Sequence, residues 1–233
     1  MSSNQDLPHR RPAPAGQAGA ALSVGDAIKY GWNRFKANAW TWIGALIIAA
    51  IIQGVLNALF GNRSTFRVDT FYQSLWTVNW IIGSIITVVV GYLISAALVR
   101  GGLHEVDGQR PSLGEFFRFT NVGNVILASL LVGVATAVGL ILFVIPGLIV
   151  AFLSWWTLQF VIDRNDSATD GIRSSFRAIS SQAGSIFLLA LALIGINILG
   201  AIALGIGLLV TIPLSIIAST YAYRVVSGGG VAT

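Results

Sequence analysis

The chain has 233 residues, of which 55% are hydrophobic and only 10% are charged, and its formal net charge is +5. A soluble domain carries roughly a quarter charged residues, so this composition argues against a soluble fold and indicates that lipid is the main solvent. The absence of cysteine excludes disulfides, thiolate metal sites and a cysteine nucleophile.

The first twenty residues, 1–20, contain no apolar segment and are rich in Pro, Gly, Gln and Ser. Such a segment cannot bury a hydrophobic face, so we expect a disordered cytoplasmic tail and no secretory signal peptide there. The following part of the chain, 21–233, is predicted to form one all-α transmembrane domain.

Four long apolar runs follow the tail, and about 20 such residues are enough to cross a hydrocarbon core of roughly 30 Å. The runs are residues 40–60, 78–99, 124–162 and 184–226. The first two fit one membrane-spanning helix each. The third and fourth would be about twice too long at roughly 1.5 Å per residue, so each is predicted to break into two helices. The sequence therefore predicts a polytopic membrane protein with six transmembrane helices.

Glycine and proline indicate where the two long runs break. In the third run, Pro146 and Gly147 predict a tight hairpin between helices near 124–143 and 146–162, because proline is favoured at the start of a helix. In the fourth run, the hairpin is expected near 203–207. The two breaks share a string, in which Gly139-Leu140 precedes Ile145-Pro146 and Gly207-Leu208 precedes Ile212-Pro213. Pro213 is expected either to start or to kink the last helix.

Lysine and arginine indicate the orientation, because cytoplasmic loops carry an excess of both. Of the 14 Lys and Arg residues, all but Arg63 and Arg67 fall on one side of the predicted spans. Both termini are therefore predicted to be cytoplasmic. The Arg-, Ala- and Gly-rich composition is typical of a GC-rich bacterium, so the expected location is the bacterial inner membrane.

Each cytoplasmic segment before a pair of spans contains a serine followed three residues later by an acid. The pairs are Ser23 with Asp26, Ser112 with Glu115, and Ser167 with Asp170. This pattern resembles a capping box, in which the serine accepts from an unpaired amide and the acid stabilises the positive end of the helix. Three copies predict an internal repeat of three hairpin units, about 23–99, 112–162 and 167–226.

Apolar residues recur at the i, i+4, i+7 spacing of one helix face after two of these serines. They are Ile28, Trp32 and Phe35 in the first unit, and Ile172, Phe176 and Ile179 in the third. Because basic residues occupy the other faces, each segment is predicted to be an amphipathic helix at the cytoplasmic interface with its apolar side toward lipid. In the middle unit, polar residues follow Phe117, which predicts a shorter helix.

Three strings resemble those of bacterial multi-pass membrane proteins of unknown function. They are Phe176-Arg177 before a span, Gly139 to Gly147 at a hairpin, and Tyr221 to Arg224 near the end of the last helix. Over roughly 23–226, the chain is similar to actinobacterial glycine- and proline-rich membrane proteins and to the membrane domain found beside some glycerophosphodiester phosphodiesterases. The resemblance implies a helical membrane scaffold and brings no catalytic residue or cofactor with it.

Polar residues give little support for an enzyme. His104, Glu105 and Asp107 lie together in a cytoplasmic connection, but their spacing fits no metal site and predicts a solvated turn. We predict no catalytic, metal or cofactor site. Uncharged polar residues in the predicted spans either bond across helices or line a polar path. These residues are Gln53, Asn57, Asn79, Gln159 and Asn197.

These features favour a non-enzymatic membrane protein that organises lipids or protein partners. The alternative is a small permease or lipid exporter subunit that works with a cytoplasmic partner such as an ATPase, and an enzyme is third. Coupled carriers place ionisable groups within the membrane, and the predicted spans hold none away from their ends. Membrane lipids and other membrane or cytoplasmic proteins are the expected partners. Nucleic acid is not expected, because the basic residues form no single patch.

Overall fold

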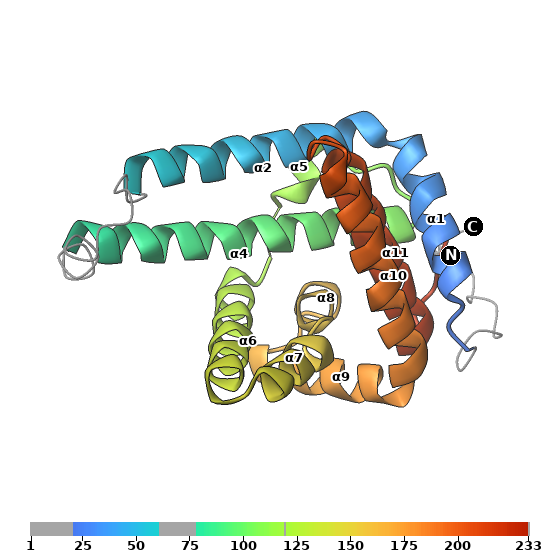
Figure 1. Cartoon of the computed structure of the whole chain (residues 1–233). Helices are drawn as coiled ribbons and strands as arrows, with labels where there is room; N and C mark the ends of the chain where they lie inside the picture. Colours follow the sequence, from blue (N-terminus) through green and yellow to red (C-terminus); the bar gives the residue numbers. More distant parts are fainter. Residues whose placement is uncertain (1–20, 61–77, 119, 233) are drawn as a thin grey trace, which may run out of the picture.

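The computed structural model describes residues 21–60, 78–118 and 120–232. The predicted tail 1–20, the loop residues Arg63 and Arg67, and the side chain of Asn79 lie outside the described residues. Every regular element within the described ranges is an α-helix (Figure 1). The helices are α1 (Val24–Ala37), α2 (Ala39–Phe60), α4 (Val78–Val106), α5 (Leu113–Phe116), α6 (Val122–Leu142), α7 (Val144–Leu153), α8 (Thr157–Asp163), α9 (Ala168–Ser181), α10 (Ala183–Ile202) and α11 (Leu208–Ser227).

Six helical segments are long and apolar enough to cross a membrane, and their mean hydropathy runs from 1.4 to 2.7. They are Ala39–Phe60, Ile81–Val106, Val122–Leu142, Val144–Asp163, Ala183–Ile202 and Leu208–Ser227. The predictions of an all-helical chain and of six apolar helices are therefore confirmed. The second segment is longer than expected, because α4 continues through the residues that were predicted to form a cytoplasmic connection.

The break between α6 and α7 falls at Phe143, where the backbone is extended with φ −155° and ψ 136°. Pro146 lies in the first turn of α7, where a missing N–H leaves no helical bond unmade. Gly139 and Gly147 meet across the turn, since a Cβ built on Gly139 would lie 2.7 Å from the Cα of Gly147. A side chain at either position would therefore force the two helices apart.

The turn between α10 and α11 has a different backbone. Leu204 and Gly205 both adopt left-handed conformations, with φ 56° and φ 76°. The helices again meet at glycine, because a Cβ built on Gly207 would lie 2.7 Å from the Cα of Gly200. Pro213 lies inside α11 and does not start it.

The prediction placed one continuous helix near 146–162, but the fourth apolar segment is divided into two helices. α7 ends at Leu153 and α8 begins at Thr157, with a turn between them. The hydroxyl of Ser154 donates to the carbonyl of Val150 at 2.6 Å. A serine that bonds back to the preceding turn competes with the helical ladder and bends the helix. The prediction missed this break because the residues between α7 and α8 include neither proline nor glycine.

α1 and α9 each have 14 residues, and each begins after the serine that the repeat predicted. Each helix buries a face of mostly small residues against the rest of the protein. The buried residues are Ala27, Gly31 and Phe35 in α1, and Ala168, Gly171, Ser175 and Ile179 in α9. Of the apolar residues predicted to face lipid, Trp32 is exposed and Phe176 is half-buried, and the contact with lipid stays a prediction. Small side chains face inward because α1 packs closely against α11, and α9 against α8.

Neighbouring helices lie side by side along much of their length (Figure 1). α2 packs along α4, α6 along α7, and α10 along α11, while α1 lies against the outer side of α11. The largest core cluster lies among α1, α8, α9, α10 and α11, and it includes the fully buried residues Trp156, Tyr223 and Ile186. This core places α8 and α11 next to each other, and both contribute to the site described below.

Candidate functional site

A cavity of about 910 Å³ lies between α4, α7, α8, α10 and α11. None of the residues that line it is charged. Most are aliphatic or aromatic, including Phe152, Trp155 and Phe187. The cavity therefore combines apolar walls with a volume typical of small-molecule sites, which run from about 300 to 1,000 Å³.

Two amide side chains from the predicted spans line this cavity. Asn197 on α10 donates to the carbonyl of Leu193 at 2.8 Å and to the hydroxyl of Ser215 on α11 at 2.7 Å. Its Oδ1 atom is buried and has no hydrogen-bond partner. Gln159 on α8 is only 4% exposed, and its Oε1 atom also has no partner. Both unpaired oxygens are buried within the wall, so the space itself stays largely apolar.

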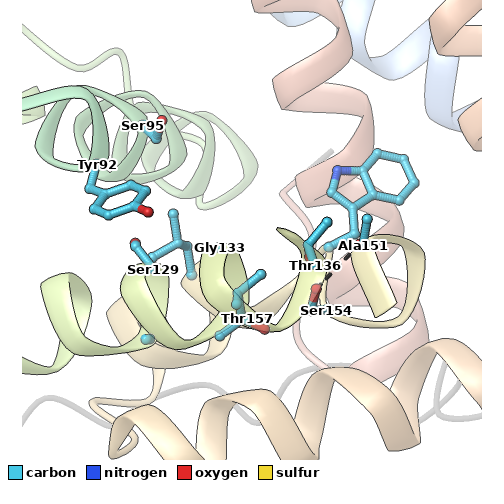
Figure 2. Close-up of a pocket in the computed structure, with 12 residues that line it drawn as sticks. Tyr92, Ser95, Ser129, Gly133, Thr136, Ala151, Ser154 and Thr157 are labelled. Atoms are coloured by element: carbon cyan, nitrogen blue, oxygen red, sulfur yellow. Dashed lines mark hydrogen bonds between the residues drawn. The ribbon is translucent and has the colours of Figure 1, made fainter. Parts of the chain in front are cut away.

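A smaller cavity of about 280 Å³ adjoins the first, and the two share Ser95, Ala151, Trp155 and Leu158 as lining residues. Figure 2 shows the smaller cavity with Tyr92 from α4 on one side and α6 across from it. The ring reaches α6 because the facing residue is Gly133, where an added Cβ would lie 2.6 Å from the Tyr92 hydroxyl oxygen.

Three hydroxyl residues from two helices line the smaller cavity. Ser129 and Thr136 come from α6, and Thr157 comes from the first turn of α8 (Figure 2). The hydroxyl oxygens of all three are buried in the wall without a hydrogen-bond partner. Buried hydroxyls normally find a partner, so these three are exceptions to that rule.

Trp156 follows the cavity-lining Trp155 and is fully buried. Its indole nitrogen donates to the hydroxyl of Ser219 at 3.1 Å, and its backbone amide donates to the hydroxyl of Ser175 at 3.1 Å. The ring packs edge-on against Tyr223, with centroids 6.1 Å apart. These contacts from α9 and α11 hold the start of α8 in place.

A charged junction lies one helical turn beyond the cavity. Gln159 and Ser219 line the cavity, and Asp163 and Tyr223 follow them one turn later on α8 and α11. Arg224 donates to carboxylate oxygens of Asp163 and of Asp107, both at 2.8 Å. The Tyr223 hydroxyl donates to the other oxygen of Asp163 at 2.7 Å.

This junction joins the ends of α4, α8 and α11, which belong to the three predicted units. The side chains of Arg224 and Asp163 are 15% and 16% exposed, whereas that of Asp107 is 43% exposed. Burial raises the pKa of the Asp107 carboxyl above its ordinary value, and the Arg224 guanidinium opposes that rise. The junction therefore joins three helix ends through paired charges, one turn from the cavity.

The predicted solvated turn at His104, Glu105 and Asp107 was wrong for Glu105, which is buried at the end of α4, whereas Asp107 lies in an exposed turn. Glu105 is 1% exposed. Its Oε1 atom accepts from Asn38 at 3.1 Å and from the Trp42 indole at 3.0 Å. A buried carboxylate needs such donors to offset its desolvation. Both donors come from the corner between α1 and α2, which is far from Glu105 in the sequence. No local pattern around Glu105 predicts them.

The C-terminal segment is hydrogen-bonded to α1. Arg34 donates to the carbonyl of Ala232 at 2.8 Å, and the Tyr30 hydroxyl donates to the same carbonyl at 3.1 Å. Burial raises the pKa of Tyr30, so the phenol keeps its proton for this bond. The end of the chain therefore lies on the same side of the molecule as α1.

The predicted capping residues lie outside both cavities. Ser23 accepts from the amide of Asp26 at 3.3 Å, and Ser167 accepts from the amide of Asp170 at 3.2 Å. In the middle unit, the backbone amide and the hydroxyl of Ser112 both donate to the same carboxylate oxygen of Glu115. These bonds hold the pKa of Glu115 below its ordinary value.

The hairpin residues Gly139, Pro146, Gly147, Gly207 and Pro213 do not line either cavity. Of the polar residues expected in the spans, Gln159 and Asn197 meet in the larger cavity. Gln53 and Asn57 lie on α2, away from it. The sequence had predicted that Ser129 and Thr136 bond to the backbone or to neighbouring helices, whereas their hydroxyl oxygens are without a partner beside the smaller cavity.

Comparison with known proteins finds relatives in mycobacteria. The chain is 33% identical to the uncharacterized protein Rv2560 of Mycobacterium tuberculosis over 91% of its own length and 71% of the relative's. It matches the uncharacterized protein Mb2590 of Mycobacterium bovis to the same extent. No protein-family model matches the chain, and no solved structure matches it. The resemblance to the membrane domain beside glycerophosphodiester phosphodiesterases stays a prediction.

Proposed function

The chain belongs to the same family as the mycobacterial proteins Rv2560 and Mb2590, and we propose that it is a non-enzymatic membrane protein that binds and organises lipid. One observation carries the proposal, which is the uncharged cavity of about 910 Å³ among helices that are apolar enough to span a bilayer. A molecule that reaches such a cavity from the bilayer must itself be largely apolar, and lipids are the abundant molecules of that kind.

A non-enzymatic role agrees with the chemistry of the lining. General acid–base catalysis requires a titratable group close to the reacting atom, and nucleophilic catalysis requires an activating base. The residues that line the larger cavity offer only amides, an indole and serine hydroxyls as polar groups. The charged groups nearby are engaged with one another, since Arg224 binds both Asp107 and Asp163.

The proposed topology has three hairpin units in the bacterial inner membrane, with both termini in the cytoplasm. Each unit begins with an amphipathic helix at the cytoplasmic interface. The equal lengths and equivalent serine caps of α1 and α9 support the repeat. On α1, the Nζ atom of Lys36 lies 5.4 Å from the centre of the exposed Trp32 ring, a pairing suited to lipid headgroups. Basic residues beside an anionic leaflet contribute on the order of 1 kcal/mol each.

Lipid retention tests the function. We expect protein purified in mild detergent to retain a defined lipid, measured by mass spectrometry of the extract. Ala190→Trp would fill the cavity and should remove that lipid. Ala201→Trp is the matched control, because Ala201 lies on the same helix, is exposed and does not line the cavity. Equal lipid content in both variants and the parent protein would refute the proposal.

Reporter fusions test the topology. A fusion at Gly61 should report the outer side of the membrane, and a fusion at Thr233 should report the cytoplasm. If both fusions report the same side, the number of spans is wrong.

A second candidate function is a small permease or lipid exporter subunit that acts with a cytoplasmic partner. The charged junction one helical turn from the cavity, where Arg224 joins the ends of α4, α8 and α11, favours it. Asn197→Leu should then abolish a measurable flux, and an ATPase should co-purify. An unchanged flux in a folded variant would count against this candidate.

A further inference from the structure

We propose that the turn between α10 and α11 ends inside the hydrocarbon core of the bilayer, where it contacts lipid acyl chains and not water. The hairpin of α10 and α11 then enters the membrane and returns at the same face, without reaching the opposite aqueous phase. The inference rests on the proposed membrane topology and adds the partner of one surface. That surface, the hairpin tip, consists of the exposed residues Leu199, Ile202, Leu204 and Ile206.

The side chains of the hairpin tip are apolar and largely exposed. Leu204 is 91% exposed, and the other three residues are 68% to 73% exposed. Between Ile198 and Val210 the chain contains no polar side chain, no Trp and no Tyr. A turn in water is usually built from Asn, Asp, Ser and Gly, and the end of a span usually carries Trp or Tyr at the interface. The composition of the turn therefore matches hydrocarbon and not an aqueous boundary.

The backbone of the turn forms its own hydrogen bonds. The amides of residues 203–206 each donate to a carbonyl of the turn or of the last turn of α10, at distances of 2.8 to 3.3 Å. An unpaired amide would need water, which the bilayer core does not contain. These four donors can therefore lie among acyl chains without losing hydrogen bonds.

Leu204 occupies a backbone conformation that favours other residues. Its φ is 56°, in the left-handed region. Asn is several-fold enriched there among non-glycine residues, because its short polar side chain bonds locally. The other non-glycine residues with positive φ in the described part of the chain are Asn121 and Asn165. A leucine at this position gives up the local bonding of asparagine for an apolar surface, which is favourable only where lipid surrounds the turn.

The distance from the charged junction also keeps the hairpin tip inside the bilayer. Arg224 and the 43% exposed Asp107 place the junction at the headgroups, because ionised groups avoid hydrocarbon. From Arg224 back to Leu208, α11 rises by about 24 Å at roughly 1.5 Å per residue, which is less than the core thickness of roughly 30 Å. Figure 1 shows α10 and α11 crossing α2 and α4, so this hairpin is tilted whenever α2 and α4 span the bilayer upright. Tilt shortens its reach further.

Acyl chains fit the hairpin tip better than a second copy of the protein does. Helices associate in membranes through small residues and polar side chains. The small residues near the turn are used within the hairpin, since a Cβ built on Gly207 would lie 2.7 Å from the Cα of Gly200. What remains on the outside is large, aliphatic and without a polar atom.

Spin labels test where the turn lies. The chain has no cysteine, so each introduced cysteine carries a single nitroxide. We compare Leu204→Cys with Ile198→Cys, which is 55% exposed on α10, and with Thr169→Cys in the exposed first turn of α9. The full chain is reconstituted in phosphatidylcholine and phosphatidylglycerol vesicles. Oxygen, which concentrates in hydrocarbon, should relax the labels at Leu204 and Ile198, whereas a water-soluble nickel chelate should relax only the label at Thr169.

The other outcomes separate the inference from the topology. If nickel relaxes the label at Leu204 as strongly as at Thr169 while Ile198 stays in hydrocarbon, the inference is overturned and the membrane topology stands. If nickel also relaxes the label at Ile198, the topology falls as well. Spin–spin broadening at Leu204, with little relaxation by either reagent, would mean that a second copy covers the hairpin tip and would overturn the contact with acyl chains.

Two substitutions at Leu204 test the same point without a label. Glycine and asparagine both suit the left-handed backbone, but only asparagine adds an amide that hydrocarbon cannot hydrogen-bond. In nanodiscs, Leu204→Gly should melt close to the parent protein, and Leu204→Asn should melt at least about 3 °C below Leu204→Gly. Equal Tm values for the two variants would contradict a turn inside the bilayer.

Discussion

Arg224 holds the junction together, and its replacement by glutamine should destabilise the whole helix bundle. The guanidinium binds Asp163 and Asp107, both at 2.8 Å. Removing one partner of a buried ion pair costs about 3–5 kcal/mol, because the other charge is left without compensation. The junction is mostly but not completely buried, with Asp107 43% exposed, so we expect about 2–3 kcal/mol for Arg224→Gln.

Thermal unfolding in mild detergent measures this loss. A chain of this size loses about 2–4 °C in Tm for each kcal/mol, so Arg224→Gln should lower the Tm by about 5–10 °C. Tryptophan fluorescence is a suitable signal, because Trp156 packs against Tyr223 beside the junction. Arg164→Gln is the matched control. Arg164 is exposed, donates to the carbonyl of Ser227 and lies 4.9 Å from the centre of the Phe160 ring, so its loss should cost about 1 kcal/mol or less.

A double variant separates the ion pair from general damage. Asp163→Asn removes one of the two negative charges that Arg224 balances. Combined with Arg224→Gln, it should cost less than the sum of the two single changes, because no unbalanced carboxylate remains on α8. The reasoning is refuted if Arg224→Gln has the same Tm as Arg164→Gln. It is also refuted if the loss of unfolding free energy in the double variant equals the sum of the losses in the two single variants.

Further predictions concern the hairpin, the buried carboxylate and the middle cap. Gly147→Ala should cost about 1–3 kcal/mol in unfolding experiments, since the new Cβ would overlap Leu140, whereas Gly195→Ala, with nothing within 4 Å, should not destabilise. Trp42→Phe should cost about 1–3 kcal/mol, because a buried carboxylate loses its indole donor. The Glu115 pKa lies below its ordinary value, so its cap is stable above about pH 4.3 and is lost as the pH falls through the lower folded value. An NMR titration of the capped amide with a midpoint at or above pH 4.3 would contradict this.

Local patterns were enough to predict the helices and the places where the chain turns. A helix that crosses a bilayer has a length set by the bilayer, so a run twice that length must break. Glycine and proline marked the two breaks, because close helix contact at Gly139 and Gly147 and the start of α7 need those residue types. The break at Ser154 escaped notice, since a serine in an apolar helix is usually compatible with continuous structure.

The pairing of charges depended on the tertiary structure. Arg224 and Asp107 are 117 residues apart, and Trp42 and Glu105 are 63 residues apart. No spacing rule connects residues at such distances. The sequence around Glu105 is polar, and polar neighbours predict solvent. Only the packing of the corner between α1 and α2 over the end of α4 buries this carboxylate and supplies its donors.

Sequence by itself determined that this protein is built from six apolar helices, because hydrophobicity and length are properties of each segment alone. The tertiary structure decided where these helices leave space and which polar residues line that space. The sequence favoured helix contacts over a polar path for Asn197 and Gln159. Their meeting in one uncharged cavity follows from how α8, α10 and α11 pack, and that packing is a property of the whole chain.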